Sequence, residues 1–308
     1  MEEKKDALEK FISESTKVQP QIVQDETIVG GGNTLNYITV DLSVLPAGIF
    51  YRPGTLVMIR AASVAEVQAY SAVDDNNFLD VTDKMNEMLG RCVRIKHPNG
   101  TTGTYKDLKD NDRLFLIFMI RELTFQKNSN LAKDVTCGAC RHEFKIQFRS
   151  TPGKDSPKTF INYEIDSELE PFFNKQDRTF DFLLGEKVWK LAPHCISLQE
   201  IFFKSIKDKV QSDKTPNVSF LKIIPFTIWD RKTISEDGIK AKEEEFKNLD
   251  MDTFLFLDEV VSKMLFGIKE LRMSCPVCGE EVHTDMTFPK GASSIFKPGI
   301  KLLDRIKK

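Results

Sequence analysis

The chain carries two Cys-x-x-Cys pairs, Cys137-Gly-Ala-Cys140 and Cys275-Pro-Val-Cys278. Each pair can present two thiolates from one tight turn, and four thiolates complete the tetrahedral shell that zinc prefers, with sulfur about 2.3 Å from the metal. About 130 residues separate the two pairs, compared with about 15–20 in a compact zinc ribbon. The sequence therefore predicts one structural zinc ion, bound by Cys137, Cys140, Cys275 and Cys278, that fastens two distant parts of the chain together.

The residues beside each pair predict a β-hairpin. Val135-Thr136 leads into the first pair, and Phe144-Lys-Ile-Gln-Phe148 follows it with alternating apolar and polar residues. Arg272-Met-Ser274 leads into the second pair, and Glu281-Val-His-Thr-Asp-Met286 follows it. Such short segments on either side of a turn are typical of paired strands. Each pair is therefore expected at the turn between two strands.

Other roles for these cysteines fit the pattern less well. A thioredoxin-like redox pair normally occurs once, beside a βαβ pattern, and buried free thiols need no such spacing. A catalytic zinc needs an open coordination position, which a four-cysteine shell does not leave. His142 and His283 lie near the pairs; each is expected to be a surface residue or a neighbour of the ligands, and substitution for a cysteine as ligand is the alternative. The two remaining cysteines, Cys92 and Cys195, stand in apolar settings and are expected to be buried, inert thiols.

Length and composition limit the classes of protein that this chain can belong to. Its 308 residues predict about two domains. Forty-four basic and 46 acidic residues give a net charge of −2, which argues against nucleic acid as the main partner. We expect no secretion signal, because the sequence opens with charged residues, and no apolar run approaches the roughly 20 residues that span a membrane. We expect folding in a reducing cytoplasm, where zinc rather than disulfides cross-links the chain, and no membrane partner.

Several features recur in the same order in the two halves of the chain. Ser63-Val-Ala-Glu66 and Ser197-Leu-Gln-Glu200 both follow a predicted strand and have the pattern of a helix capping box. Ile120-Arg-Glu-Leu-Thr-Phe125 and Ile268-Lys-Glu-Leu-Arg-Met273 then precede the two cysteine pairs. Chance similarity between short strings is the alternative. The recurrence predicts an internally duplicated α+β fold, whose halves each end in a zinc-knuckle hairpin and share one four-cysteine zinc site.

The predicted organisation has four parts. An N-terminal segment with a glycine-rich joint covers 1–36, the first repeat 37–150, the second repeat 151–288, and a basic tail with interspersed apolar residues 289–308. The hydrophobic spacing predicts helices near 64–73, 78–90, 111–121, 197–211 and 252–266, and a hairpin with a Gly-X turn over 178–191. The charged stretch 238–250 is expected to be a solvated helix or a loop.

No motif indicates catalysis. The chain has no Gly-x-Ser-x-Gly or His-Glu-x-x-His sequence, and its four histidines lie beside no nucleophile or base pattern. The glycine run at 30–32 lacks the Gly-Lys-Ser/Thr ending of a phosphate loop. We therefore expect that the protein is not an enzyme.

Several of these segments together resemble a known family. They are Leu45-Pro-Ala-Gly-Ile-Phe-Tyr51 and the strand up to Arg60, the capped helix that follows, the segment 112–125 and the Cys-x-x-Cys hairpin. Together they resemble baseplate hub and hub-assembly proteins of T4-type contractile-tailed bacteriophages, over about residues 38–288. The resemblance implies a structural or assembly protein that folds in the host cytoplasm and binds other baseplate or tail proteins. It also implies that the protein is either kept in the virion tail baseplate or acts only during assembly.

A zinc-ribbon accessory protein that binds nucleic acid is the main alternative. It would need a basic face with aromatic residues for stacking. The residues around the cysteine pairs are instead mixed in charge, with basic Lys133, Arg141, Lys145 and Arg149 and acidic Asp134, Glu143, Glu280, Glu281 and Asp285. No nucleic-acid partner is therefore expected. Protein contacts are expected through the tail after Pro289 or the segment before Gly30, because neither can bury its apolar residues alone.

Overall fold

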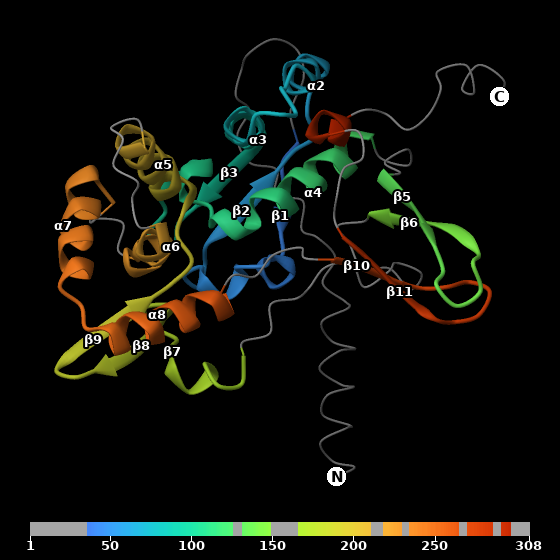
Figure 1. Cartoon of the computed structure of the whole chain (residues 1–308). Coiled ribbons are helices and arrows are strands. Elements are labelled where there is room, and N and C mark those ends of the chain that lie inside the picture. Colours follow the sequence, from blue (N-terminus) through green and yellow to red (C-terminus); the bar gives the residue numbers. More distant parts are fainter. Residues whose placement is uncertain are drawn as a thin grey trace, which may run out of the picture.

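The computed structural model describes residues 36–125, 131–148, 166–210, 218–229, 234–264, 270–285 and 291–296. Within these residues the chain has the predicted mixed α+β fold, with several small antiparallel sheets (Figure 1). In the same ranges, every helix is too short or too polar to cross a membrane. The predicted N-terminal segment and most of the tail after residue 289 lie outside the described residues.

The first half is built on a four-stranded antiparallel sheet with the strand order β1-β2-β3-β4. Its strands are β1 (Ile38–Val40), β2 (Leu56–Ile59), β3 (Val93–Lys96) and β4 (Thr102–Gly103). Its α-helices are α2 (Val64–Ser71), α3 (Phe78–Cys92) and α4 (Arg113–Phe125). Short 3-10 helices connect them: η1 (Leu42–Val44), η2 (Gly48–Phe50), η3 (Tyr105–Asp107) and η4 (Asp110–Asp112). The three α-helices confirm the helices predicted in this half.

The second half contains a three-stranded antiparallel sheet with the order β7-β8-β9. Its elements are η6 (Glu170–Phe172), β7 (Phe173–Asn174), β8 (Thr179–Leu184), β9 (Lys187–Leu191), α5 (Ile196–Val210), α6 (Val218–Thr227), α7 (Glu236–Lys247) and α8 (Met251–Met264). Gly185, with φ of 62°, forms the predicted turn between β8 and β9. Helices α5 and α8 confirm the prediction, whereas α6 was not predicted.

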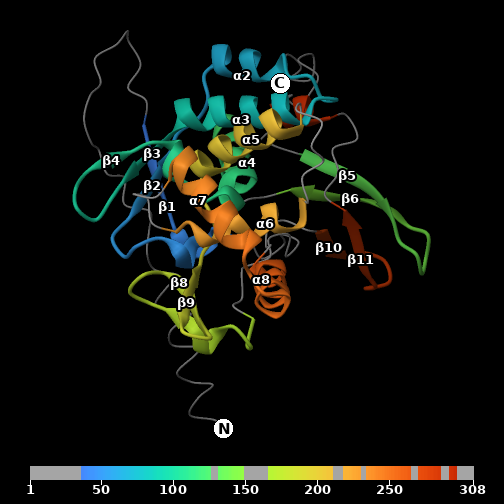
Figure 2. The same cartoon turned by 60° about the vertical axis from the view of Figure 1, so that its left-hand side comes forward.

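Each half ends in a two-stranded hairpin, as predicted. The first consists of β5 (Leu131–Thr136) and β6 (Glu143–Phe148), and the second of β10 (Glu270–Ser274) and β11 (Glu281–Asp285). Figures 1 and 2 show the two hairpins side by side, projecting away from the helices on one side of the molecule. Strand β10 lies next to β6, and β11 next to β5.

Two hydrophobic cores hold the fold, and each receives side chains from the other half. The core of the second half surrounds Trp189 and Leu257 and includes Phe50 from η2 of the first half. The core of the first half surrounds α4 and includes Ile196 from the start of α5. The backbones of the two halves are also hydrogen-bonded to each other: the Ile196 amide donates to the Leu108 carbonyl oxygen over 2.9 Å. The two halves are therefore packed against each other and are not independent domains joined only by a linker.

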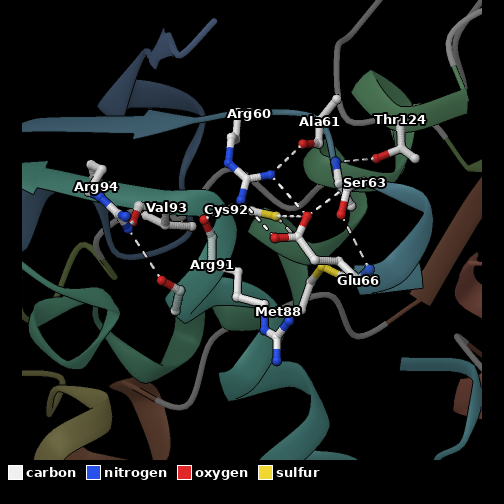
Figure 3. Close-up of polar contacts among 12 residues, drawn as sticks. Arg60, Ala61, Ser63, Glu66, Met88, Arg91, Cys92, Val93, Arg94 and Thr124 are labelled. Carbon is white, nitrogen blue, oxygen red and sulfur yellow. Dashed lines mark hydrogen bonds and ion pairs between the residues drawn. The ribbon is translucent and has the colours of Figure 1, made fainter. Parts of the chain in front are cut away.

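A buried ion pair fixes the start of α2 (Figure 3). Arg60, which directly follows β2, donates to the Glu66 carboxylate over 2.7 Å and to the Arg91 carbonyl oxygen over 2.8 Å. Glu66 also accepts from the Ser63 amide over 2.7 Å, and Ser63 Oγ accepts from the Glu66 amide, which confirms the first predicted capping box. The hydrogen bond from Arg60 is the main cause that lowers the pKa of Glu66 to about 2. The pair thereby joins β2, α2 and the end of α3.

Two details of the predicted repeat are wrong. Ser197 lies inside α5 and does not cap it, and Glu200 instead accepts hydrogen bonds from Asn86 (3.1 Å) and Tyr105 (3.0 Å) of the first half. The similar strings before the cysteine pairs also differ in structure. Residues 120–125 end helix α4, whereas 270–273 belong to strand β10.

The C-terminal region also differs from the expectation. Residues Ala292–Phe296 form the 3-10 helix η8, which packs on α2 and α4. Ile295 and Phe296 are fully buried in the core of the first half, and Phe296 contacts the ring of Tyr70 at a centroid distance of 4.8 Å. Asp75 anchors the segment by accepting from the Ser293 amide over 2.7 Å. These two apolar residues are therefore part of the chain's own core and not a surface for a partner.

Candidate metal centre

The two cysteine loops have the same backbone geometry. In the first, the Cys137 amide donates to the His142 carbonyl oxygen (2.9 Å), and the Arg141 amide donates to the Cys137 carbonyl oxygen (2.9 Å). In the second, the Cys275 amide donates to the Glu280 carbonyl oxygen (2.7 Å), and the Gly279 amide donates to the Cys275 carbonyl oxygen (2.9 Å). The fifth residue of each loop is left-handed, with φ of 58° at Arg141 and 77° at Gly279. Each hairpin thus turns both of its cysteines toward the same side.

The four sulfur atoms lie together, as the sequence predicts. Each lies within 4.8 Å of the others. The Cys137–Cys278 sulfur distance is 3.5 Å, and the Cys140–Cys275 distance is 3.6 Å. These distances are close to the roughly 3.8 Å edge of a tetrahedron with metal–sulfur bonds of 2.3 Å. They are far above the roughly 2.05 Å of a disulfide.

The surroundings of the cluster follow an approximate two-fold pattern. The first cysteine of each pair, Cys137 or Cys275, is buried, whereas the second, Cys140 or Cys278, is exposed. The two buried cysteines, Cys137 and Cys275, form a small separate core with Val282, Val135 and Phe144. Strand β10 of the second hairpin lies next to β6 of the first, and β11 lies next to β5. Each half therefore supplies an equivalent half of the site.

Backbone amides stabilise negative charge on the sulfurs. Burial raises the pKa of Cys275, but hydrogen bonds from the Cys278 and Val277 amides and from neighbouring thiols outweigh it and lower this pKa to about 6. At Cys278 the Glu280 amide lowers the pKa, but hydrogen bonds with Cys140 and the other thiols outweigh it and raise the pKa to about 12. Without a cation, the sulfurs therefore share protons unequally. A metal ion at their centre would favour four thiolates at once.

The donor set is that of a structural metal ion such as zinc. Tetrahedral sites with four sulfur ligands are typical of zinc or iron, and the four thiolates leave no open position for a substrate. His142 and His283 are exposed, and neither belongs to the cluster. Cys92 is fully buried, and burial raises its pKa to about 12. Cys195 is only partly buried, which differs from the buried thiol expected there.

Sequence reasoning missed a buried polar cluster at the junction of the halves. Asp112 accepts hydrogen bonds from the Ala47 amide and the Tyr51 hydroxyl, both over 2.7 Å. Burial raises the pKa of Asp112 to about 7. Tyr51 Oη in turn accepts from the Lys109 amide over 2.9 Å. Asp112 lies 65 residues from Ala47 and 61 from Tyr51, and no local spacing links them, so the sequence did not indicate that these side chains meet.

Comparisons with family models, with curated proteins and with solved structures found no match. The interpretation of the site therefore depends on its geometry and its donor atoms.

Proposed function

We propose that this chain is a non-catalytic structural or assembly protein of a contractile phage tail baseplate, of the hub or hub-assembly type, stabilised by one zinc ion. The observation that carries the proposal is the cluster of Cys137, Cys140, Cys275 and Cys278, which joins two distant hairpins. A closed shell of four thiolates suits a structural metal and leaves no place for a reacting ligand. The resemblance of residues 38–288 to baseplate hub proteins supports the biological setting, with folding in the host cytoplasm and a location in the tail baseplate.

The proposal includes an internal duplication. Each half runs from an antiparallel strand pair through helices to a cysteine hairpin, and the two cysteine loops share their hydrogen-bond pattern. The pair β3–β4 has no counterpart among the described residues of the second half. The duplication would therefore be old enough for one half to gain or lose a strand pair. It would explain why a single metal site draws its ligands from both halves.

Exposed apolar side chains supply a candidate contact surface for other tail proteins. Met251 and Leu255 of α8 are 66% and 55% exposed. On the β8–β9 hairpin, Leu183 and Val188 face each other across the strands and are 70% and 52% exposed. Such residues are candidates for burial against a protein partner. We propose them as the contact residues in place of Ile295 and Phe296 of the tail, which are buried in the protein's own core.

Co-expression with the hub and tail proteins encoded in the same genome tests the proposal. We expect a complex that survives size-exclusion chromatography and whose formation is weakened by Leu255→Glu. Lys240→Gln, which makes the net charge more negative by the same one unit on the exposed side of α7, is the matched control and should leave association intact. Both variants should keep their metal, because neither residue lies at the cysteine cluster.

Binding to nucleic acid would support the alternative. A zinc-ribbon accessory protein should bind DNA or RNA strongly at low salt and lose affinity steeply as salt rises. Around the cysteine loops, Lys145 lies 3.6 Å from Asp134, so part of the basic charge there is already balanced. Salt-dependent nucleic-acid binding, together with no association with any co-expressed tail protein, would overturn the proposed function.

A further inference from the structure

A cavity of about 570 Å³ lies where the two halves meet. The first half supplies Arg52, the start of the β3–β4 turn at His97, and Lys109. The second half supplies Arg178, just before β8, and Trp229, after α6. Its volume is in the range of pockets that hold small organic molecules. It is separate from the cysteine cluster, none of whose ligands lines it.

The charged lining of this cavity has an excess of unpaired cations. Within the part of the chain that the structure describes, none of the side chains of Arg52, Lys109 and Arg178 forms an ion pair with a carboxylate. The two acidic residues of the lining are already engaged. Asp107 contacts His97 over 3.4 Å and accepts from the Thr104 amide over 3.0 Å. Asp177 is paired with Lys190. Three basic side chains therefore stand against two carboxylates, one of which is already paired with Lys190 outside the lining, so the net charge of the lining is positive.

Arg178 occupies a position that would suit glycine better. Its φ of 60° is left-handed, a conformation that costs free energy in any residue with a Cβ atom. One guanidinium nitrogen donates to the Ile49 carbonyl oxygen over 3.2 Å. Its Nε is buried and has no hydrogen-bond partner among the described residues. A strained residue with an unsatisfied buried donor at a cavity wall indicates a role in binding.

Lys109 and the apolar wall define the ligand further. Lys109 Nζ donates to the Pro193 carbonyl oxygen over 2.9 Å, which holds the amine at the cavity. Burial lowers the pKa of this amine, and an anion in the cavity would act together with the nearby Asp112 to keep the amine charged. Ile95, Ile228 and Trp229 add apolar surface to the same lining. A ligand that suits both parts has an anionic group and an apolar or aromatic body.

We propose that this cavity binds an organic anion, a carboxylate or phosphate ester with an apolar body, through Arg52, Lys109 and Arg178. The inference does not depend on the baseplate function, because it uses only the lining of the cavity. Charge-assisted hydrogen bonds from two or three cations would fix the anionic group. The apolar body would lie against the wall that contains Trp229.

Isothermal titration calorimetry with three probes of similar size tests this. Phenyl phosphate and benzoate supply the two anionic groups, and benzyl alcohol supplies the same ring without charge. We expect at least one anion to bind the full-length protein with a dissociation constant on the order of 1 mM or lower, and benzyl alcohol to bind at least about tenfold more weakly. The anion that binds better identifies the preferred group.

Variants then locate the binding. Arg178→Gly removes the guanidinium and suits the left-handed backbone, so the variant should stay folded and lose affinity by about tenfold or more. Arg52→Gln should also weaken binding, whereas Lys240→Gln, an equal charge change on α7, should not. No binding of either anion, equal binding of benzyl alcohol, or unchanged affinity in Arg178→Gly would overturn the proposal. If Arg178→Gly does not fold, wild-type affinity in Arg52→Gln would overturn it instead.

Discussion

Replacing Phe296 with alanine measures how far the C-terminal segment belongs to the core of the first half. The Phe296 side chain is 0% exposed and lies against the rings of Tyr70 and Phe125, at centroid distances of 4.8 Å and 6.4 Å. Truncating a buried phenylalanine costs about 3–5 kcal/mol, from lost burial and from the cavity left behind. The segment is a short 3-10 helix of five residues, so it can shift to fill part of the cavity. We therefore expect a loss of about 3 kcal/mol in the free energy of unfolding, at the lower end of this range.

Equilibrium unfolding in urea, with the metal retained, is the assay. Phe78→Ala is the matched control, because it makes the same chemical change at a side chain that is 67% exposed. It should cost less than about 1 kcal/mol. The midpoint should fall for Phe296→Ala at an unchanged slope, which reports a change of stability rather than of compactness. If the two variants lie within about 1 kcal/mol of each other, the packing of the C-terminal segment is not as described.

Three further predictions follow from the cysteine cluster and the buried charges. Cys275→Ser should lose the metal, whereas Cys195→Ser should retain it, as measured by metal analysis after gel filtration. Glu66→Gln should cost about 3 kcal/mol because it leaves Arg60 buried without its partner, whereas Glu87→Gln, at an exposed pair, should cost less than about 1 kcal/mol in urea unfolding. Burial raises the pKa of Asp112 from 3.8 to about 7, so its protonated form favours the folded state. The wild type should therefore lose stability relative to Asp112→Asn as the pH rises from about 4 to 7, by up to about 1.4 kcal/mol per pH unit; equal pH profiles would contradict this.

The cysteine site could be predicted from sequence because its signal is local and chemically specific. A Cys-x-x-Cys loop between two short strands builds half of a tetrahedral shell by itself. Each loop supplies only two of the four ligands that the metal takes, so the two loops, and with them Cys137 and Cys278, are expected to meet. The first capping box was equally local, because Ser63 and Glu66 satisfy each other's amides without help from the rest of the fold.

Features that depend on contacts between the halves could not be predicted. The Ser197 capping box fails because backbone pairing of Ile196 with Leu108 starts α5 earlier, and Glu200 is drawn to Asn86 and Tyr105. The similar strings before the hairpins differ because strand pairing decides the structure of 270–273, while α4 is fixed by its buried position in a core.

The helices between α5 and α8 show two other limits. Pro225 lies within α6, and a proline is normally read as a helix breaker. Helix α7 was expected to be a solvated helix or a loop because of its charges. Its buried apolar residues Ile239 and Phe246 lie at the i, i+7 spacing of one helix face, which was a signal for a helix packed on one side.

We propose that one metal ion, zinc, joins the two halves through Cys137, Cys140, Cys275 and Cys278. X-ray absorption at the zinc edge on the purified protein, normalised to protein concentration, tests it most directly. We expect one zinc per chain with a single shell of four sulfur atoms at about 2.3 Å. A zinc spectrum with nitrogen or oxygen ligands, two zinc ions per chain, or no bound metal in protein purified without chelators would contradict it.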